Sequence, residues 1–258
     1  MRPHALACAL GWCIAAAASA AGPPADARRS GFDFMGPSTQ AMQRDDAQNP
    51  AMLWVQEGQA LWNTAAGARN TSCAGCHGDA ASSMRGVAAR YPAFDAQAGG
   101  PLTLAERIGE CRRRHQQAPP LEAESHALLS LESHVARQSR GLPIEAAGDA
   151  RLAPFRERGR ALFFQRIGQL GLACAQCHDH HAGQRLGGNV IPQGHPTGYP
   201  IYRLQWQGMG SLQRRLRNCM TGVRAEPFPF GAQELTELEL YLKQRAAGMA
   251  MDAPAVRP

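Results

Sequence analysis

Two copies of the pattern Cys-x-x-Cys-His carry the most specific chemistry in this chain, at Cys73–His77 and Cys174–His178. The pattern is the attachment motif of c-type haem, in which both thiols bond to the porphyrin and the histidine ligates the iron. We therefore predict two covalently bound haem c groups. The attachment residues are Cys73, Cys76, Cys174 and Cys177, and the histidine ligands are His77 and His178.

One further cysteine follows each motif, at Cys111 and Cys219. Methionine, the common second ligand, has no matched pair of positions: Met84 is too close to His77 to wrap round a porphyrin, and Met209 has no counterpart in the first half. We predict Cys111 and Cys219 as the second axial ligands. Thiolate ligation gives a low potential, which suits a catalytic centre better than a mobile electron carrier.

Two alternatives stay open for these positions. Thiols in an oxidising compartment pair readily, so Cys111 and Cys219 could form a disulfide between the two halves, although matched residues would then have to meet on the axis relating them. Bis-histidine ligation is the second alternative, since His180 and His181 directly follow the second motif. The other candidates, expected on the surface or in loops, are His115, His126, His134 and His195.

The segments that must position these residues are duplicated. Apolar residues before each motif follow the i, i+4, i+7, i+8 spacing of one helix face, with a glycine at the same place in each, Gly58 and Gly159. Such a glycine allows a second helix to cross closely. Pro50 and Pro154 suit the first turns of these helices.

The second half of each repeat also matches. Leu104-x-x-Arg107-x-x-x-Cys111 corresponds to Leu212-x-x-Arg215-x-x-x-Cys219, and a later helical pattern at 128–135 corresponds to 235–242. Each repeat therefore predicts a helix, a haem motif, a loop, a short helix ending in cysteine and a final helix, with few strands. This order indicates a mainly α fold of two tandem class I cytochrome c domains.

The predicted organisation has five parts. Residues 1–21 resemble a cleaved secretory signal peptide, with an apolar stretch and an Ala-Ser-Ala site, so Cys8 and Cys13 are expected to be removed. A polar N-terminal arm (22–49) has no convincing helix face and is either a flexible leader or an arm laid against a partner. The first domain (50–141), a linker (142–152) and the second domain (153–258) follow. We predict a periplasmic protein without a membrane span.

The net charge of +6 is carried almost wholly by arginine, because Lys243 is the only lysine. Arginine binds carboxylates and small oxyanions through a planar fork of donors, although a base-composition bias would give the same excess. No basic tract with interleaved aromatic residues is present, which argues against nucleic acid as a partner.

Longer runs of sequence carry a resemblance to a known family. They are Gly86–Pro92 in the first repeat and Pro196–Arg203, Trp206–Cys219 and Gly222–Pro227 in the second. Together with the haem motifs, these runs resemble the SoxA family, the dihaem cytochrome subunits of L-cysteine S-thiosulfotransferase in bacterial sulfur oxidation. The resemblance covers nearly all of the chain beyond the signal peptide.

The resemblance implies a specific reaction and specific partners. A SoxA subunit pairs with SoxX, a monohaem cytochrome c, and joins thiosulfate to a cysteine of the carrier protein SoxYZ. It implies that Cys219 is the catalytic persulfide-carrying cysteine and that Arg215 binds thiosulfate. Arg215 and Cys219 are four residues apart, so on a helix they share one face. Arg203 and Arg224 are further candidate cations, unless they form surface salt bridges.

Other functions are consistent with parts of the pattern. A dihaem electron-transfer cytochrome without catalysis would tolerate Cys219→Met. A thiosulfate dehydrogenase would join two thiosulfates into tetrathionate without a carrier protein. A dihaem peroxidase needs an open iron, and nothing in the sequence indicates one.

Overall fold

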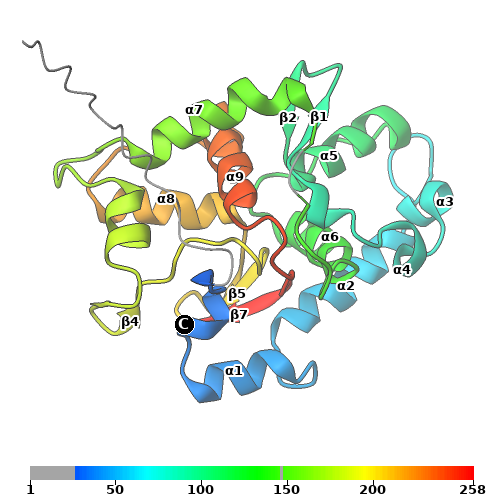
Figure 1. Ribbon diagram of the computed structural model, residues 1–258. Helices are drawn as coiled ribbons and strands as arrows, with labels where there is room; N and C mark the ends of the chain where they lie inside the picture. The colour runs from blue at the N-terminus through cyan, green and yellow to red at the C-terminus, as the bar shows by residue number, and fades with distance from the viewer. Residues whose placement is uncertain (1–26, 146–147) are drawn as a thin grey trace, which may run out of the picture.

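The computed structural model describes residues 27–145 and 148–258, and helices make up most of the regular secondary structure in this part of the chain (Figure 1). The predicted signal peptide lies outside the described residues. In the first half the elements are η2 (Gly31–Phe34), α1 (Pro37–Arg44), α2 (Ala51–Asn63), α3 (Cys73–His77), α4 (Ala80–Ser83), η3 (Ala88–Arg90), β1 (Ala93–Asp95), β2 (Gly100–Leu102), α5 (Leu104–Cys111), η4 (Arg112–Gln116) and α6 (His126–Arg137). In the second half they are η5 (Ala150–Leu152), α7 (Ala153–Phe164), η6 (Gln176–His180), β3 (Arg185–Leu186), β4 (Asn189–Val190), β5 (Ile201–Arg203), β6 (Gly208–Gly210), α8 (Leu212–Gly222), α9 (Gln233–Arg245) and β7 (Ala255–Arg257).

Each half is built on one crossed pair of helices, α2 with α6 and α7 with α9. The predicted glycines lie at the crossings. A Cβ placed on Gly58 would lie 2.0 Å from the Ser130 carbonyl oxygen, and one on Gly159 would lie 1.9 Å from the Glu237 carbonyl oxygen. Both distances are far inside van der Waals contact, so only glycine lets the two backbones approach this closely.

The structure contains more strands than the sequence pattern predicted, and some of them are duplicated between the halves. The hairpin β1–β2 corresponds to β5–β6, and each hairpin leads into the short helix that ends near the lone cysteine, α5 or α8. These strands have only three residues each, too few for a period-two pattern to stand out. Strand β7 adds to β5 in parallel and gives a three-stranded sheet of order β6-β5-β7.

The N-terminal arm contains a helix, contrary to the prediction. Helix α1 has Pro37 in its first turn and packs beside β7 (Figure 1). The sequence of α1 shows no clear apolar face because none of its own residues is buried. The buried side chain is that of Met35, just before the helix. The described part of the arm is thus laid on its own chain, and helix formation here depends on tertiary contact rather than on periodicity.

The C-terminal segment links the two halves. Met251 and Ala253 are buried in the same core as Trp62 and Leu131 of the first half. The backbone of Met251 also exchanges hydrogen bonds with the segment Gly141–Leu142. Among the described residues, no helix combines the length and the apolar character needed to cross a membrane.

A cavity of about 40 Å³ lies where the two halves meet. Equivalent positions of the two repeats face it in pairs: Tyr91 with Tyr199, Leu104 with Leu212 and Glu132 with Glu239, together with Lys243. Burial raises the pKa of Glu132 to about 8, with Glu124 adding to the rise and Lys243 opposing it. Burial lowers the pKa of Lys243 to about 8 although Glu239 and Glu132 oppose the change. The cavity therefore holds the ionisable side chains of Glu132, Glu239 and Lys243 away from bulk water.

Candidate active site

The second haem motif presents its histidine in one defined tautomer. His178 lies in η6, and its Nδ1 is 2.7 Å from the carbonyl oxygen of Pro192. A carbonyl oxygen only accepts, so Nδ1 carries the hydrogen and donates it. The Nε2 lone pair is therefore free to bind a metal ion, with the orientation of the ring fixed by its other nitrogen.

Cys219 faces this histidine from helix α8. The helix begins after Ser211, whose hydroxyl oxygen accepts a hydrogen bond from the Arg214 amide at 3.1 Å. The His178 imidazole is close enough to Cys219 to influence its thiol, and since Nδ1 is engaged by Pro192, Nε2 is the ring nitrogen left to face the sulfur. Cys174 of the motif lies near Cys219 and Cys177, whose charges affect the pKa of its thiol. Two attachment thiols beside an opposed nitrogen and sulfur are the donor set of a haem c with His/Cys axial ligands.

Two arginines change the chemistry of the Cys219 thiol. Burial alone would raise its pKa, but the neighbouring His178 imidazole and the positive charges of Arg215 and Arg203 lower the pKa to about 7. The thiolate is the form that attacks sulfur and binds metals. Much of Cys219 is therefore thiolate at neutral pH.

Arg203 was a candidate for a surface salt bridge, but it is only 8% exposed. Its Nε donates to the carbonyl oxygen of Pro258 at 2.6 Å, and its guanidinium lies 5.1 Å from the Trp206 ring centroid. Burial lowers the pKa of Arg203, and the neighbouring charge of Arg215 lowers it further, with no carboxylate among the causes. Within the described residues, neither guanidinium has an ion pair to an aspartate or glutamate side chain, and Arg203 is held by the main chain of Pro258, the last residue. Two adjacent guanidinium groups without an Asp or Glu partner favour an anion beside them.

Tyr199 adds a neutral donor to the same place. Burial raises its pKa to about 12; Arg215 opposes the rise and Cys219 adds to it. The phenol is therefore protonated at neutral pH beside the thiol and the guanidinium. It lies between the Cys219 site and the cavity that Tyr199 also lines.

The first haem site is arranged differently. Cys111 lies close to Cys73 and Cys76, and burial raises the pKa of Cys111 despite the charges of Arg107 and Arg114. His77 is exposed, and its ring centroid lies 5.8 Å from that of Trp62. The structure thus brings the three thiols of this site together, without a described contact between His77 and Cys111.

Arg107 has the carboxylate partner that its counterpart Arg215 lacks. Its Nη2 lies 2.6 Å from Asp95 Oδ2, and Arg114 lies 3.9 Å from the other oxygen of the same carboxylate. A backbone hydrogen bond from Ala98 and the Arg107 guanidinium lower the pKa of Asp95. The carboxylate partner of Arg107 is therefore Asp95, and the arginine is neutralised.

The alternatives for the axial positions fit the structure less well. All six described cysteines are free, so Cys111 and Cys219 form no disulfide with each other. Met209 is 2% exposed in a core with Tyr202 and Leu129, and Met84 packs against the first core. His180, His181 and His115 are exposed, and Arg224 is exposed as well.

Two histidines are more buried than expected. His134 is 7% exposed, with its ring 5.9 Å from that of Trp62, and burial lowers its pKa. His195 lies in a loop as predicted but is only 9% exposed, and its Nδ1 donates to the carbonyl oxygen of Arg29 at 2.9 Å. The sequence pattern missed these because the partners that bury them come from distant segments.

Comparison with known families matches both halves of the chain. The family described as SoxA/TsdA, cytochrome c domain, matches residues 57–144 and 158–251. A curated relative from Pseudaminobacter salicylatoxidans is 37% identical over 245 residues, which cover 95% of this chain and 86% of that protein. This chain belongs to the SoxA family.

Further SoxA relatives support the assignment. The protein from Rhodovulum sulfidophilum is 34% identical over 90% of this chain and 81% of its own length. Both relatives are named L-cysteine S-thiosulfotransferase subunit SoxA, so the predicted family and enzyme are confirmed. A chain of the crystal structure of SoxXA from P. pantotrophus superposes with a TM-score of 0.87 at 33% identity, covering 92% of each chain. The mainly helical structure and the match of the cytochrome c domain in two segments are consistent with the predicted tandem domains, and that domain implies covalent haem c.

Proposed function

We propose that this chain is the catalytic subunit of a SoxAX complex that joins thiosulfate to the carrier cysteine of SoxYZ. Its partner would be SoxX, and the reaction would take place in the periplasm after removal of residues 1–21. Support comes from the SoxA relatives, from the SoxXA structure with the same fold, and from the local chemistry at Cys219.

The observation that carries the proposal is the pair of arginines beside Cys219, Arg203 and Arg215, neither of which is paired with an Asp or Glu side chain among the described residues. Thiosulfate is a dianion, and a guanidinium can hold its sulfonate oxygens by charge-assisted hydrogen bonds. Arg215 is the proposed thiosulfate-binding residue, and Arg203 adds positive charge from the neighbouring strand. The same two charges help to lower the pKa of the Cys219 thiol, so they favour both the thiolate nucleophile and the binding of an anionic substrate.

The net reaction balances as follows. A carrier thiol and thiosulfate form one S–S bond between the carrier sulfur and the outer sulfur of thiosulfate. One proton and two electrons are released, and the product is a cysteine S-thiosulfonate. Cys219 is proposed as the catalytic residue and the persulfide carrier. Loss of the two electrons to the acceptor would join its sulfur to the outer sulfur of thiosulfate, and attack of the carrier thiolate on that outer sulfur would then form the adduct and release Cys219 in its original state.

The residues that would hold haem are the two motifs and the two lone cysteines. We propose two haem c groups, attached at Cys73 and Cys76 and at Cys174 and Cys177. The axial pairs would be His77 with Cys111 and His178 with Cys219. When bound, the haem supplies a one-electron acceptor, and a thiolate ligand stabilises its ferric form.

The test is a mass measurement on SoxYZ after incubation with the purified complex, thiosulfate and an electron acceptor. We expect the carrier to gain one thiosulfate per cysteine. Tetrathionate formed at the same rate without SoxYZ would contradict the proposal and indicate a thiosulfate dehydrogenase. Transfer of electrons without any sulfur product would indicate an electron-transfer cytochrome.

A further inference from the structure

The loop of residues 191–197, here called the proximal loop, forms one wall of the site around His178. Pro192 accepts the hydrogen bond from His178 Nδ1 at 2.7 Å. Two residues later, Gly194 lies against the ring: a Cβ placed there would be 3.2 Å from His178 Cγ and 3.4 Å from Nδ1. The φ of Gly194 is +71°, a backbone conformation that other residues rarely adopt. This loop therefore determines both the tautomer and the position of the imidazole.

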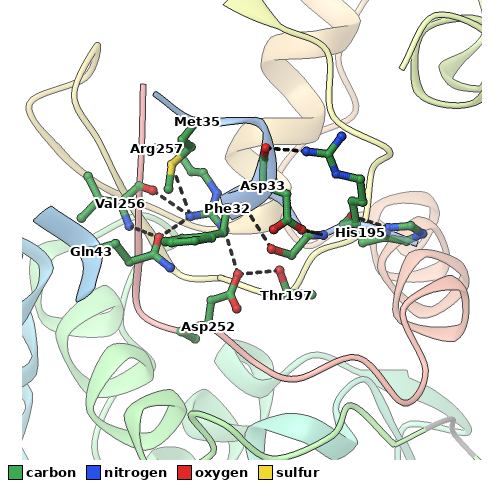
Figure 2. A network of polar contacts seen from close by, with 12 residues as sticks. Phe32, Asp33, Met35, Gln43, His195, Thr197, Asp252, Val256 and Arg257 are labelled. Atoms are coloured by element: carbon green, nitrogen blue, oxygen red, sulfur yellow. Dashed lines mark hydrogen bonds and ion pairs between the residues drawn. The ribbon is translucent and has the colours of Figure 1, made fainter. Parts of the chain in front are cut away.

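The N-terminal arm holds this loop on both sides of Gly194. The Arg29 amide donates to Gln193 Oε1 at 2.6 Å, and Gln193 Nε2 donates to the Ala27 carbonyl oxygen at 3.2 Å. On the other side, His195 Nδ1 donates to the Arg29 carbonyl oxygen at 2.9 Å (Figure 2). The arm and the loop are more than 160 residues apart in sequence, yet they are joined by three hydrogen bonds.

The two hydrogen bonds of Gln193 are exposed, but the end of the proximal loop is anchored in the interior of the protein. Thr197, at the end of the loop, is fully buried and donates to Asp252 at 3.0 Å. Asp252 also pairs with Arg257 at 3.1 Å, and Arg257 hydrogen-bonds Gln43 of α1 (Figure 2). The arm is thus connected to the same network at two points, near Arg29 and at Gln43.

The first haem site has no equivalent support within the described residues. His77 is exposed, packs on Trp62, and has no described hydrogen bond to either ring nitrogen. The arm also pairs with the first half, through Asp46 with Arg137 and Arg140, but its described hydrogen bonds to a loop that holds a motif histidine lie at the site with Cys219.

We propose that the arm, through Gln193 and His195, is a positioning element for His178 and a part of the second haem site. Gln193 and His195 are positioning residues: they hold the proximal loop, and the loop holds the imidazole. The inference rests on the proposed role of His178 as an iron ligand. A backbone acceptor on Nδ1 makes the imidazole a stronger donor to a metal, so loosening the loop weakens the ligand.

The test is a redox titration of the holoprotein in its complex, followed by electron paramagnetic resonance. Variants His195→Leu and Gln193→Ala should shift the potential of the second haem to more positive values and change its low-spin signal. The first haem is the internal reference and should not change. His195→Asn places an amide N–H near the position of Nδ1 and should restore the original signal, whereas Gln48→Ala, an arm residue bonded only to Asp45, should have no effect.

Three results would overturn the inference. An unchanged second haem in both variants, with faster proteolysis of the arm, would show that the arm and the site are independent. Equal changes at both haems, or no rescue by His195→Asn, would indicate a general structural role. Absence of a His/thiolate signal in the unmodified protein would instead contradict the proposed axial ligands, so the two failures are distinguishable.

Discussion

Asp95 and Arg203 occupy the same position in the two halves of the chain, the last residue of the strand that precedes the cysteine-bearing helix. The strand pairs have the same register, with Asp95 opposite Gly100 and Arg203 opposite Gly208. In the first half Asp95 neutralises Arg107, whereas in the second half Arg203 adds a second positive charge beside Arg215. The change from an acidic to a basic residue at this strand position therefore replaces an ion pair with two adjacent cations.

The substrate arginine can be tested against its own duplicate. Arg215→Ala should lower kcat/KM for thiosulfate by roughly 10- to 100-fold, since a hydrogen bond to a charged group contributes about 1.5–3 kcal/mol. Arg107→Ala is the matched control and should leave the rate within about twofold, because its guanidinium is already paired with Asp95. Equal losses in both variants would contradict the assignment of thiosulfate to the second site.

The strand position itself predicts a second effect. Arg203→Asp should place a carboxylate beside Arg215, as Asp95 is placed beside Arg107. We expect KM for thiosulfate to rise at least about tenfold, because the new ion pair competes with the substrate and repels it. Steady-state kinetics at low and high ionic strength check this. An unchanged KM would exclude Arg203 from the electrostatics of the site.

The cavity between the halves predicts a pH dependence of stability. The pKa of Glu132 is raised from 4.5 to about 8 in the folded chain, so the folded state binds more protons than the unfolded state between these values. The contribution of Glu132 is thus full below about pH 4.5 and is lost as the pH rises towards 8. Lys243 acts in the separate window from about 8 to 10.5, where its lowered pKa makes stability increase with pH.

Glu132→Gln should therefore increase the free energy of unfolding at pH 8 by on the order of 1–3 kcal/mol, the usual cost of a buried unpaired polar group. At pH 5 the change should be small. Urea denaturation of the holoprotein at both pH values measures the difference, and the exposed Glu157→Gln is the control. The same pH slope in Glu132→Gln as in the unmodified protein would contradict the raised pKa.

The helix crossings predict a strong dependence on glycine. Gly159→Ala would bring a methyl group within 1.9 Å of the Glu237 carbonyl oxygen, so α7 and α9 must separate. We expect a loss of at least about 2 kcal/mol of stability, with a lower yield of haem in the second site. Gly36→Ala, where no atom lies within 4 Å, should be nearly neutral. Normal stability of Gly159→Ala would show that the crossing can relax.

The sequence predicted those parts of the fold that depend on residues close together in the chain. The helix periodicities, the glycines at the crossings and the duplicated cysteines all lie within short windows, and the structure places them as expected. Helix α1 and the burial of His195 depend on partners more than 100 residues away, and strand β7 depends on its pairing with the distant strand β5. No window of sequence contains both members of those contacts.

In the candidate site, too, the arrangement of nearby residues was predictable and the contacts between distant segments were not. Arg215 and Cys219 were predictable because a helix places residues four apart on one face. The buried position of Arg203 was not, because it depends on the pairing of β5 with β6 and β7 and on the carbonyl of Pro258. A comparison of the two repeats at Asp95 and Arg203 would have required the strand register, which only the structure provides.

The most direct test of the whole account replaces each lone cysteine with methionine and measures the mass of SoxYZ after turnover with thiosulfate. Cys111→Met should still form the thiosulfate adduct, because its site is proposed to lack the substrate. Cys219→Met should keep a ligated haem but form no adduct. Full adduct formation by Cys219→Met would contradict the central claim that this cysteine carries the sulfur chemistry.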